Sequence, residues 1–194
     1  MIIRPAELRD LPDLRDLFLR SRRAAFVWEM PSIFALEDFD KETDGETITI
    51  SADGDRLTGF SSVWQPSNFI HHLHVDPRHV GRGIGRSLLS ALPGWRSVRY
   101  QLKCVSANRA ALAFYLANGF VEVGRGQADN HEYRLLETAI GAGSRETSNA
   151  GKDMALPFST LASGLARTDV AVHEWAGLLA YRLGGKTTSL LPSR

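Results

Sequence analysis

The sequence contains one cysteine, Cys104, so no disulfide can form within the chain, and we expect it to work in a reducing compartment. No apolar run approaches the length of about 18 residues that a transmembrane helix requires. Acidic residues follow soon after Met1, which argues against a secretory signal peptide. These absences predict a cytoplasmic protein that does not enter a membrane.

The sequence also has no large excess of charge of one sign. It contains 23 Lys and Arg residues and 22 Asp and Glu residues, for a formal net charge of +1. Binding to nucleic acid or to an anionic membrane generally needs a strongly basic surface, so we expect neither partner. His71, His72 and His74 lack an evident carboxylate or cysteine partner in the sequence, and we expect no metal.

The most informative segment is residues 75–89, where an apolar strand pattern runs through glycines into an amphipathic helix pattern. Glycine lets a ligand approach the backbone closely. The first amides of the helix lack partners inside it, and with the positive end of the helix dipole they form a seat for an anion such as a pyrophosphate. The glycines are Gly81, Gly83 and Gly85, and the basic residues around this seat are Arg78, Arg82 and Arg86.

Two other glycine motifs do not fit this segment. A dinucleotide-binding fingerprint would need a third glycine where Arg86 stands, and a Walker A loop would have Lys after Gly85. A strand–loop–helix corner that uses glycine only for close packing remains the structural alternative.

A second segment, residues 106–120, has Asn108 before a helical pattern that contains Phe114-Tyr115 and ends at Gly119. With the glycine loop before it, the sequence resembles the GNAT superfamily of acyl-CoA-dependent N-acyltransferases. The resemblance implies an α/β fold (an α+β mixed sheet) with helices on both faces, and acetyl-CoA as the acyl donor. It implies an N-acetyltransferase; the alternative is a protein that senses acyl-CoA without turnover.

In this family the glycine loop holds the CoA pyrophosphate, and the pantetheine arm lies between two splayed strands, here residues 69–75 and 98–105. Val80 stands where the family usually has Gln or Arg, but it keeps its backbone N–H, so CoA binding is still expected. The resemblance implies cofactor contacts from Leu73, His74, Val75, Val80, Gly81, Arg82, Gly83, Ile84, Gly85, Arg86, Ser87, Asn108, Ala111 and Tyr115.

Tyr115 stands at the family's usual position for the acid that protonates the leaving thiolate, although it could instead be a core aromatic beside Phe114. Some relatives have a Glu that acts as the general base at the position where this chain has Lys103. The general base of those relatives therefore has no direct counterpart in this sequence. The candidate bases are His72, His74 and Glu29. His72 and His74 share a sheet face by strand alternation, which directs His71 to the opposite face.

The acceptor is expected to be the amine of a small molecule, an amino acid or a peptide N-terminus. Its expected contacts are Phe26, Trp28, Glu29 and Trp64. A partly apolar wall with few acids would be formed by Phe26, Trp28, Met30, Phe34 and Trp64. That composition argues against a polyamine. The same aromatic residues could equally belong to the core.

The chain is expected to divide into an acetyltransferase domain at 1–137, a Gly- and Ser-rich linker at 138–158 and an amphipathic helical extension at 159–184. The extension would dock on its own domain or on a partner chain, which leaves a homodimer open. Expected strands are 2–4, 47–51, 57–64, 69–75, 98–105, 120–123 and 131–136. One expected helix begins at Asp10, and a short second helix lies within 22–41. A third ends near Leu92, and a fourth spans 108–118.

Overall fold

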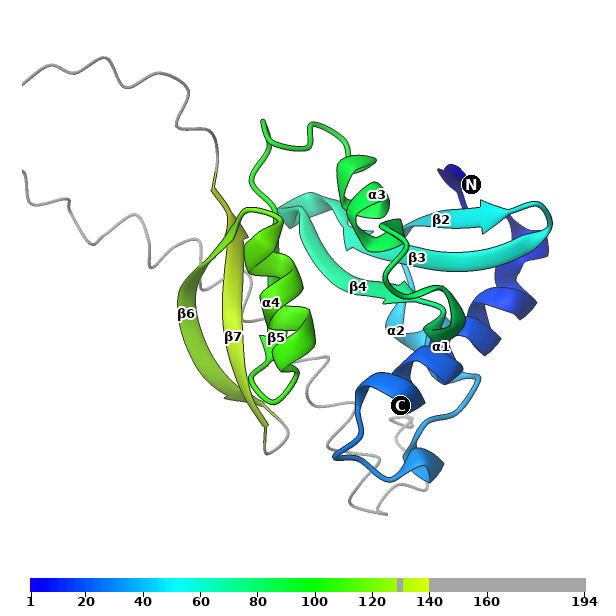
Figure 1. Cartoon of the computed structure of the whole chain (residues 1–194), viewed down its shortest axis with the longest axis horizontal. Helices are drawn as coiled ribbons and strands as arrows, with labels where there is room; N and C mark the ends of the chain where they lie inside the picture. Colours follow the sequence, from blue (N-terminus) through cyan, green and yellow to red (C-terminus); the bar gives the residue numbers. More distant parts are fainter. Residues whose placement is uncertain (129–130, 140–194) are drawn as a thin grey trace, which may run out of the picture. The chain divides into compact units, whose positions relative to one another are not determined.

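The computed structural model describes residues 1–128 and 131–139 (Figure 1). A seven-stranded mixed sheet in the order β1-β2-β3-β4-β5-β7-β6 confirms the predicted fold class. The strands are β1 (Ile2–Pro5), β2 (Thr47–Asp53), β3 (Arg56–Trp64), β4 (Phe69–Val75), β5 (Gln101–Val105), β6 (Phe120–Ala128) and β7 (His131–Thr138). The helices are α1 (Leu11–Ala25), α2 (Asp38–Glu42), α3 (Ile84–Ser90) and α4 (Arg109–Ala117), with single 3-10 turns η1 (Leu8–Asp10), η2 (Pro31–Ile33), η3 (Gln65–Ser67) and η4 (Pro77–His79).

The element boundaries differ from the predicted ones mainly at β5 to β7. β5 begins three residues later than predicted, because the amide of Val98 bonds the Gly94 carbonyl in a turn. β6 and β7 are longer than their apolar patterns suggested, since both continue through polar residues. Residues 1–126 and 132–139 belong to one compact unit. Apart from Thr138 and Ala139, the predicted linker and extension lie outside the described residues.

Two apolar clusters occupy the two faces of the sheet. Alternate residues of β3 separate them, because a Cβ on Gly59 would meet α3 while Phe60 packs with α1 and α2. The α1–α2 cluster comprises Leu14, Leu17, Phe18, Phe39, Ile50, Ala52, Leu57 and Phe60. The cluster under α3 and α4 includes Ile70, Leu89, Leu102, Leu112, Tyr115, Phe120 and Leu136. Burial of each large side chain contributes about 1.5–3 kcal/mol, so these clusters hold the helices against the sheet.

The start of α1 is at Asp10, as expected, because this residue is at the N-cap position, but its side chain makes no cap bond to the helix. Its carboxylate instead accepts bonds from the Arg4 guanidinium at 2.7 and 2.8 Å and from the Glu7 amide at 2.7 Å. Asp10 therefore ties β1 to the turn before α1.

The centre of the sheet is irregular in two ways that shape the site. β4 and β5 run parallel, but Phe69 and Gln101 form their only register pair within residues 1–128 and 131–139, so the two strands diverge beyond that point. Against β3, the register of β4 shifts between Ser62–His72 and Val63–Ile70, which leaves His71 as an extra residue in a β-bulge. Neighbouring side chains at a bulge need not alternate between faces.

The described residues contain no helix that is both long and apolar enough to cross a membrane.

Candidate functional site

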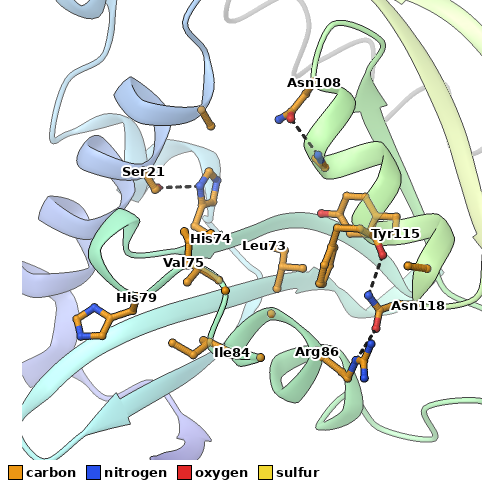
Figure 2. Close-up of a pocket in the computed structure, with 18 residues that line it drawn as sticks. Ser21, Leu73, His74, Val75, His79, Ile84, Arg86, Asn108, Tyr115 and Asn118 are labelled. Carbon is orange, nitrogen blue, oxygen red and sulfur yellow. Dashed lines mark hydrogen bonds between the residues drawn. The ribbon is translucent and has the colours of Figure 1, made fainter.

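A cleft of about 520 Å³ opens where β4 leaves β5 (Figure 2). Residues from α1, the end of β4, the glycine loop with α3, and α4 line it. They are Ser21, Ala25, Leu73, His74, Val75, His79, Val80, Gly81, Gly83, Ile84, Gly85, Arg86, Asn108, Ala111, Phe114, Tyr115, Ala117 and Asn118. Every residue predicted to contact the cofactor is in this set except Arg82 and Ser87.

The glycines of the loop serve two different needs. Gly81 and Gly83 have φ values of +84° and +79°, a left-handed conformation that side chains disfavour, and a Cβ on either would meet nothing within 4 Å. Gly85 has an ordinary backbone, but its Cβ would come within 3.0 Å of the Phe114 ring. Thus Gly81 and Gly83 shape an open loop, and Gly85 lets α3 approach α4.

The start of α3 offers amide donors to the cleft. Its first intrahelical bond runs from the Ser87 amide to the Gly83 carbonyl at 3.0 Å, so the amides of Ile84, Gly85 and Arg86 precede that bond. Arg86 also lines the cleft, where its Nε donates to Asn118 Oδ1 at 3.3 Å. On the opposite wall, Asn108 caps α4 by accepting a bond from the Ala111 amide at 3.1 Å, as its position in the motif predicted.

Arg78 does not add charge to this seat, because a buried carboxylate holds it elsewhere. Asp76 is 0% exposed and accepts bonds from the Arg78 amide, the Arg78 guanidinium and the Arg20 guanidinium at 2.7–3.0 Å. Hydrogen bonds from Arg78 are the main reason why the pKa of Asp76 lies well below its ordinary value. Asp76 therefore joins the glycine loop to α1.

We expect Asp76→Asn to lower the free energy of unfolding at pH 7 by about 2 kcal/mol. Removing one partner of a fully buried ion pair costs about 3–5 kcal/mol, and we expect less here because both arginines reach solvent. A carboxyl with a lowered pKa stabilises the fold above its ordinary pKa of about 3.9, and this contribution disappears as the pH falls. The difference between wild type and variant in urea unfolding should therefore narrow below pH 5. Asp40→Asn, which breaks an exposed pair with Arg15, is the control and should change little. Equal effects of the two substitutions would contradict the role given to Asp76.

Of the predicted bases, His74 is the one that lines the cleft. Its Nδ1 lies 2.8 Å from the Ser21 hydroxyl, which also lies 3.0 Å from the Phe18 carbonyl oxygen. If the single hydroxyl proton goes to that carbonyl, Nδ1 of His74 must donate to the hydroxyl. Burial and, secondarily, the charge of Arg22 lower the pKa of His74 to about 3, so the ring is neutral at physiological pH.

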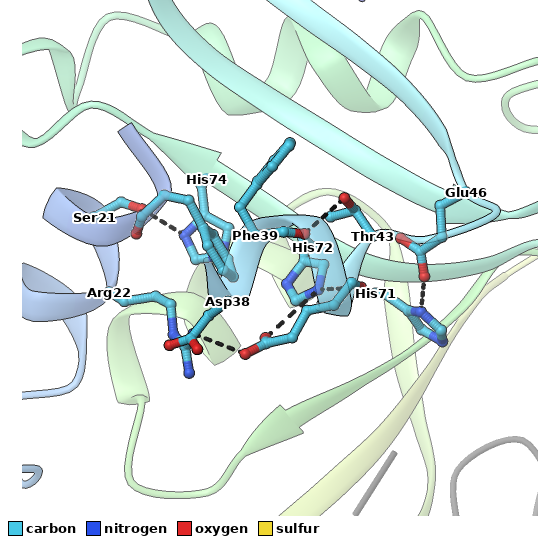
Figure 3. A network of polar contacts seen from close by, with 11 residues as sticks. Ser21, Arg22, Asp38, Phe39, Thr43, Glu46, His71, His72 and His74 are labelled. Carbon is cyan, nitrogen blue, oxygen red and sulfur yellow. Dashed lines mark hydrogen bonds and ion pairs between the residues drawn. The ribbon is translucent and has the colours of Figure 1, made fainter. Parts of the chain in front are cut away.

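His72 lies on the same face as His74, as predicted, because both rings contact the Phe18 ring, with centroids 5.1 and 5.0 Å away. Its Nε2 is 3.2 Å from the Glu42 carbonyl oxygen, to which it donates (Figure 3). Burial, followed by the charges of His74 and His71, lowers its pKa well below the ordinary value. The nearby guanidinium of Arg22 pairs with Glu42 at 2.8 Å.

His71 is not directed away from this group as strict alternation would require. At the bulge its Nδ1 pairs with the Glu46 carboxylate, and its ring centroid is 6.3 Å from that of His72. In Figure 3, Glu46 and His71 lie beside the network that contains His72 and His74.

The side chain of Tyr115 lies in the cleft, and its hydroxyl points toward the middle (Figure 2). Burial, with a smaller contribution from Cys104, raises the pKa of Tyr115, so the phenol stays protonated at physiological pH. Burial also raises the pKa of the Cys104 thiol to about 11, as expected for a packing cysteine rather than a nucleophile.

The structure does not bring the predicted acceptor residues into this cleft. Phe26 and Trp28 pack edge to face with ring centroids 5.3 Å apart, on the segment after α1 that also holds Glu29. Trp64 ends β3, where a Cβ on Gly45 would lie 3.2 Å from its ring. Their proposed contact with an acceptor stays a prediction.

Sequence reasoning missed several residues of the cleft, which are Ser21, Ala25, His79, Phe114, Ala117 and Asn118. The α4 members follow helical periodicity from Asn108 and could have been added to the motif. Ser21 and Ala25 are one helical turn apart on α1 and carried no such signal, because only tertiary packing brings α1 to β4.

Residues 1–128 and 131–139 contain no group of three or more His, Cys, Asp or Glu side chains that could hold a metal ion.

Residues 44–122 match a family model described as an acetyltransferase (GNAT) domain. No curated protein matches the chain by sequence. Solved structures with the same fold include a GCN5-related N-acetyltransferase from Rhodopseudomonas palustris, with a TM-score of 0.60, 20% identity and coverage of 71% of this chain and 94% of that one. The ribosomal-protein-S18-alanine N-acetyltransferase from Escherichia coli has a TM-score of 0.58 and 17% identity over 76% and 99% of the two chains. The PaiA N-acetyltransferase from Thermoplasma acidophilum, in complex with coenzyme A, has a TM-score of 0.55 and 16% identity over 71% and 99%.

Proposed function

This chain carries a GNAT acetyltransferase domain, and we propose that it moves the acetyl group of acetyl-CoA to a primary amine of a small molecule, an amino acid or a peptide N-terminus. The observation that carries the proposal is the cleft between β4 and α4, in which the residues of both sequence motifs meet. The similar PaiA structure contains coenzyme A, which supports the same ligand class here.

The diphosphate of the donor would bind at the glycine loop. The left-handed Gly81 and Gly83 leave open space for a ligand, and the amides at the start of α3 donate toward it. Arg86 supplies a positive charge in the cleft, whereas Val80, which is 68% exposed, contributes its backbone only. Arg82 and Ser87 remain proposed contacts at the margin of this seat.

The pantetheine arm would lie along the edge of β4 that faces away from β3. β3 pairs with one edge through Leu73, His74 and Val75, and β5 has already diverged from the other. Backbone groups on that edge can bond an extended amide chain as a further strand would. Anchoring both ends of the donor makes attack by the amine effectively intramolecular.

The chemistry then needs two proton transfers. An alkylammonium has a pKa near that of lysine, about 10, so a base must remove a proton before the nitrogen can attack. Tyr115 is protonated and points into the cleft, which supports its proposed role as donor to the departing thiolate. Of the predicted bases, His74 lines the cleft, His72 lies behind it, and Glu29 is outside it, while the low pKa values of both histidines make them weak proton acceptors.

A binding and turnover experiment tests the proposal. Acetyl-CoA at about 100 times its dissociation constant should raise the free energy of unfolding by about 2.7 kcal/mol. The melting temperature should then rise by roughly 5–11 °C in a thermal-shift assay. Release of free CoA thiol should depend on both acetyl-CoA and an added amine such as phenethylamine, L-alaninamide or spermidine. Stabilisation without thiol release from any amine would favour an acyl-CoA sensor, and no stabilisation at millimolar acetyl-CoA would contradict both functions.

The acceptor is proposed from composition and from its place in the fold. The aromatic segment after α1 offers an apolar contact, and Glu29 is its carboxylate. One similar structure is named as an acetyltransferase of a ribosomal-protein alanine, which supports a peptide N-terminus among the candidates. In the amine panel, L-alaninamide should therefore be acetylated faster than spermidine.

A further inference from the structure

Arg86 is the only Arg, Lys, Asp or Glu side chain among the described residues that line the cleft. It is exposed, and within residues 1–128 and 131–139 it forms no ion pair with a carboxylate. Arg78 and Arg20 differ in this respect, because the buried carboxylate of Asp76 pairs with both of them. The cleft therefore contains one positive charge that no acidic group compensates.

A neutral partner holds the Arg86 side chain instead. Its Nε donates to Asn118 Oδ1 at 3.3 Å, and Asn118 Nδ2 donates to the Phe114 carbonyl oxygen at 2.7 Å. The reverse orientation of this amide would set N–H against N–H and oxygen against oxygen, so the two bonds fix the orientation of the amide. Figure 2 shows the resulting chain of bonds from α4 through Asn118 to Arg86.

Asn118 can orient another side chain because burial and hydrogen bonds fix its own position. Only 5% of the residue is exposed, and its backbone amide bonds carbonyl oxygens of α4 at 3.0 and 3.1 Å. Burial of a side-chain amide is costly unless its polar atoms are bonded, and Arg86 supplies the bond to Oδ1. This contact links the first turn of α3 to the end of α4.

The bond to Asn118 leaves the outer end of the guanidinium free. An arginine has five N–H donors, and Nε supplies only one of them. Nη1 and Nη2 of Arg86 have no hydrogen-bond partner in the described part of the chain. Their N–H groups form a planar fork that matches two oxygens of one phosphate group. Because Asn118 is uncharged, it orients this fork without cancelling the charge that attracts the phosphate.

We propose that Asn118 is a positioning residue that presents the Arg86 guanidinium to a phosphate group of the acyl donor, an inference that rests on the proposed function. Arg86 comes directly after the glycine loop, and side chains on a helix lean toward the start of that helix. Acetyl-CoA carries phosphate in two places, which are the diphosphate and the 3′-phosphate of its ribose. Either one offers the oxygens that the fork would bind. The contact adds to binding of the donor and takes no part in the transfer itself.

The first test measures acetyl-CoA affinity by calorimetry in a double-mutant cycle. Arg86→Gln should raise the dissociation constant about 10-fold, because it removes charged hydrogen bonds to the phosphate. Asn118→Ala should raise it about threefold, since the guanidinium keeps its charge but loses its orientation, and the double variant should bind no more weakly than Arg86→Gln alone. Arg56→Gln removes the same charge from an exposed arginine outside the cleft and should bind acetyl-CoA as the wild type does.

The second test separates positioning from the structural role of Asn118 at the end of α4. Thr43 offers the matched control, because it is the C-cap of α2 and its Oγ1 donates to the carbonyl oxygen four residues back, on Phe39, at 2.8 Å. Both Asn118→Ala and Thr43→Ala should lower the melting temperature by about 2–4 °C. Only Asn118→Ala should raise the KM for acetyl-CoA, and its kcat at saturating acetyl-CoA should stay at the wild-type value.

A third measurement identifies the phosphate, with the 3′-dephospho form of acetyl-CoA as the probe. If Arg86→Gln shows the same deficit with this probe as with acetyl-CoA, the guanidinium binds the diphosphate. If the deficit disappears, it binds the 3′-phosphate. Both results support a phosphate contact.

The outcomes separate the inference from the function on which it rests. Wild-type affinity of Arg86→Gln for acetyl-CoA would overturn the phosphate contact. Equal losses from Asn118→Ala with and without Arg86, or a fall in kcat at an unchanged KM for acetyl-CoA, would overturn the positioning role of Asn118. A rise in the KM of the amine alone would show that Arg86 serves another ligand. If millimolar acetyl-CoA does not stabilise the wild type, the proposed function fails, and this inference fails with it.

Discussion

Gly83→Val is expected to weaken acetyl-CoA binding by about 100-fold. Valine at a φ of +79° is strained by at least 1–2 kcal/mol, and a β-branched side chain adds to this cost. The loop can relieve the strain by turning its peptide groups, and the amides at the start of α3 then lose their common direction. Each factor of ten in affinity corresponds to about 1.4 kcal/mol, so a 100-fold loss corresponds to about 2.8 kcal/mol of binding free energy. Loss of the loop conformation that directs these amides can account for a loss of that size. Calorimetric titration with acetyl-CoA measures it.

Gly54→Val is the matched control for this prediction. Gly54 has a φ of +59°, and a Cβ on it would meet nothing within 4 Å, so the strain is of the same kind. It lies between β2 and β3 and does not line the cleft. Both variants should lose stability, but only Gly83→Val should lose affinity for acetyl-CoA. Equal affinities for the two variants would show that the glycine loop does not hold the donor.

Tyr115→Phe is expected to lower kcat by about 100-fold while the affinity for acetyl-CoA changes by less than about threefold, because the hydroxyl acts only when the thiolate leaves. The loss of kcat should not depend on pH near neutrality. Burial raises the pKa of Tyr115 above its ordinary value of about 10, so the donor stays protonated from pH 6 to pH 9. The ratio of wild-type to variant kcat should therefore be constant over that range.

Tyr100→Phe serves as the control for loss of a buried phenol. The Tyr100 hydroxyl donates to the Pro93 carbonyl at 2.8 Å, and the residue does not line the cleft. Its removal should cost about 1 kcal/mol of stability and leave kcat unchanged. A Tyr115→Phe variant with wild-type kcat would return Tyr115 to a purely structural role beside Phe114.

Local features of the chain were predictable because each is decided by a few neighbouring residues. Gly81 and Gly83 adopt the conformations that favour glycine, and Asn108 caps the helix that it precedes. The strands and helices in their order were also readable from apolar periodicity. The two motifs therefore led to the same cleft before any long-range contact was known.

Side-chain direction was not predictable where a distant partner or an irregular strand decides it. Arg78 was expected at the anion seat, but Asp76 holds it, with Arg20 from α1 on the same carboxylate. Ser21 reaches His74 across 53 positions of sequence.

The sequence by itself determined the conformation of the glycine loop and the cap of α4, since their geometry depends on local backbone preference. The position of Tyr115 followed from the family resemblance. Only the tertiary structure decided which histidine meets a carboxylate. One extra residue in β4 turns His71 toward Glu46, 25 positions away, and no strand periodicity contains that information. The physical reason is that a bulge is a property of two paired strands, and a buried histidine–carboxylate contact is a property of the packed fold around them.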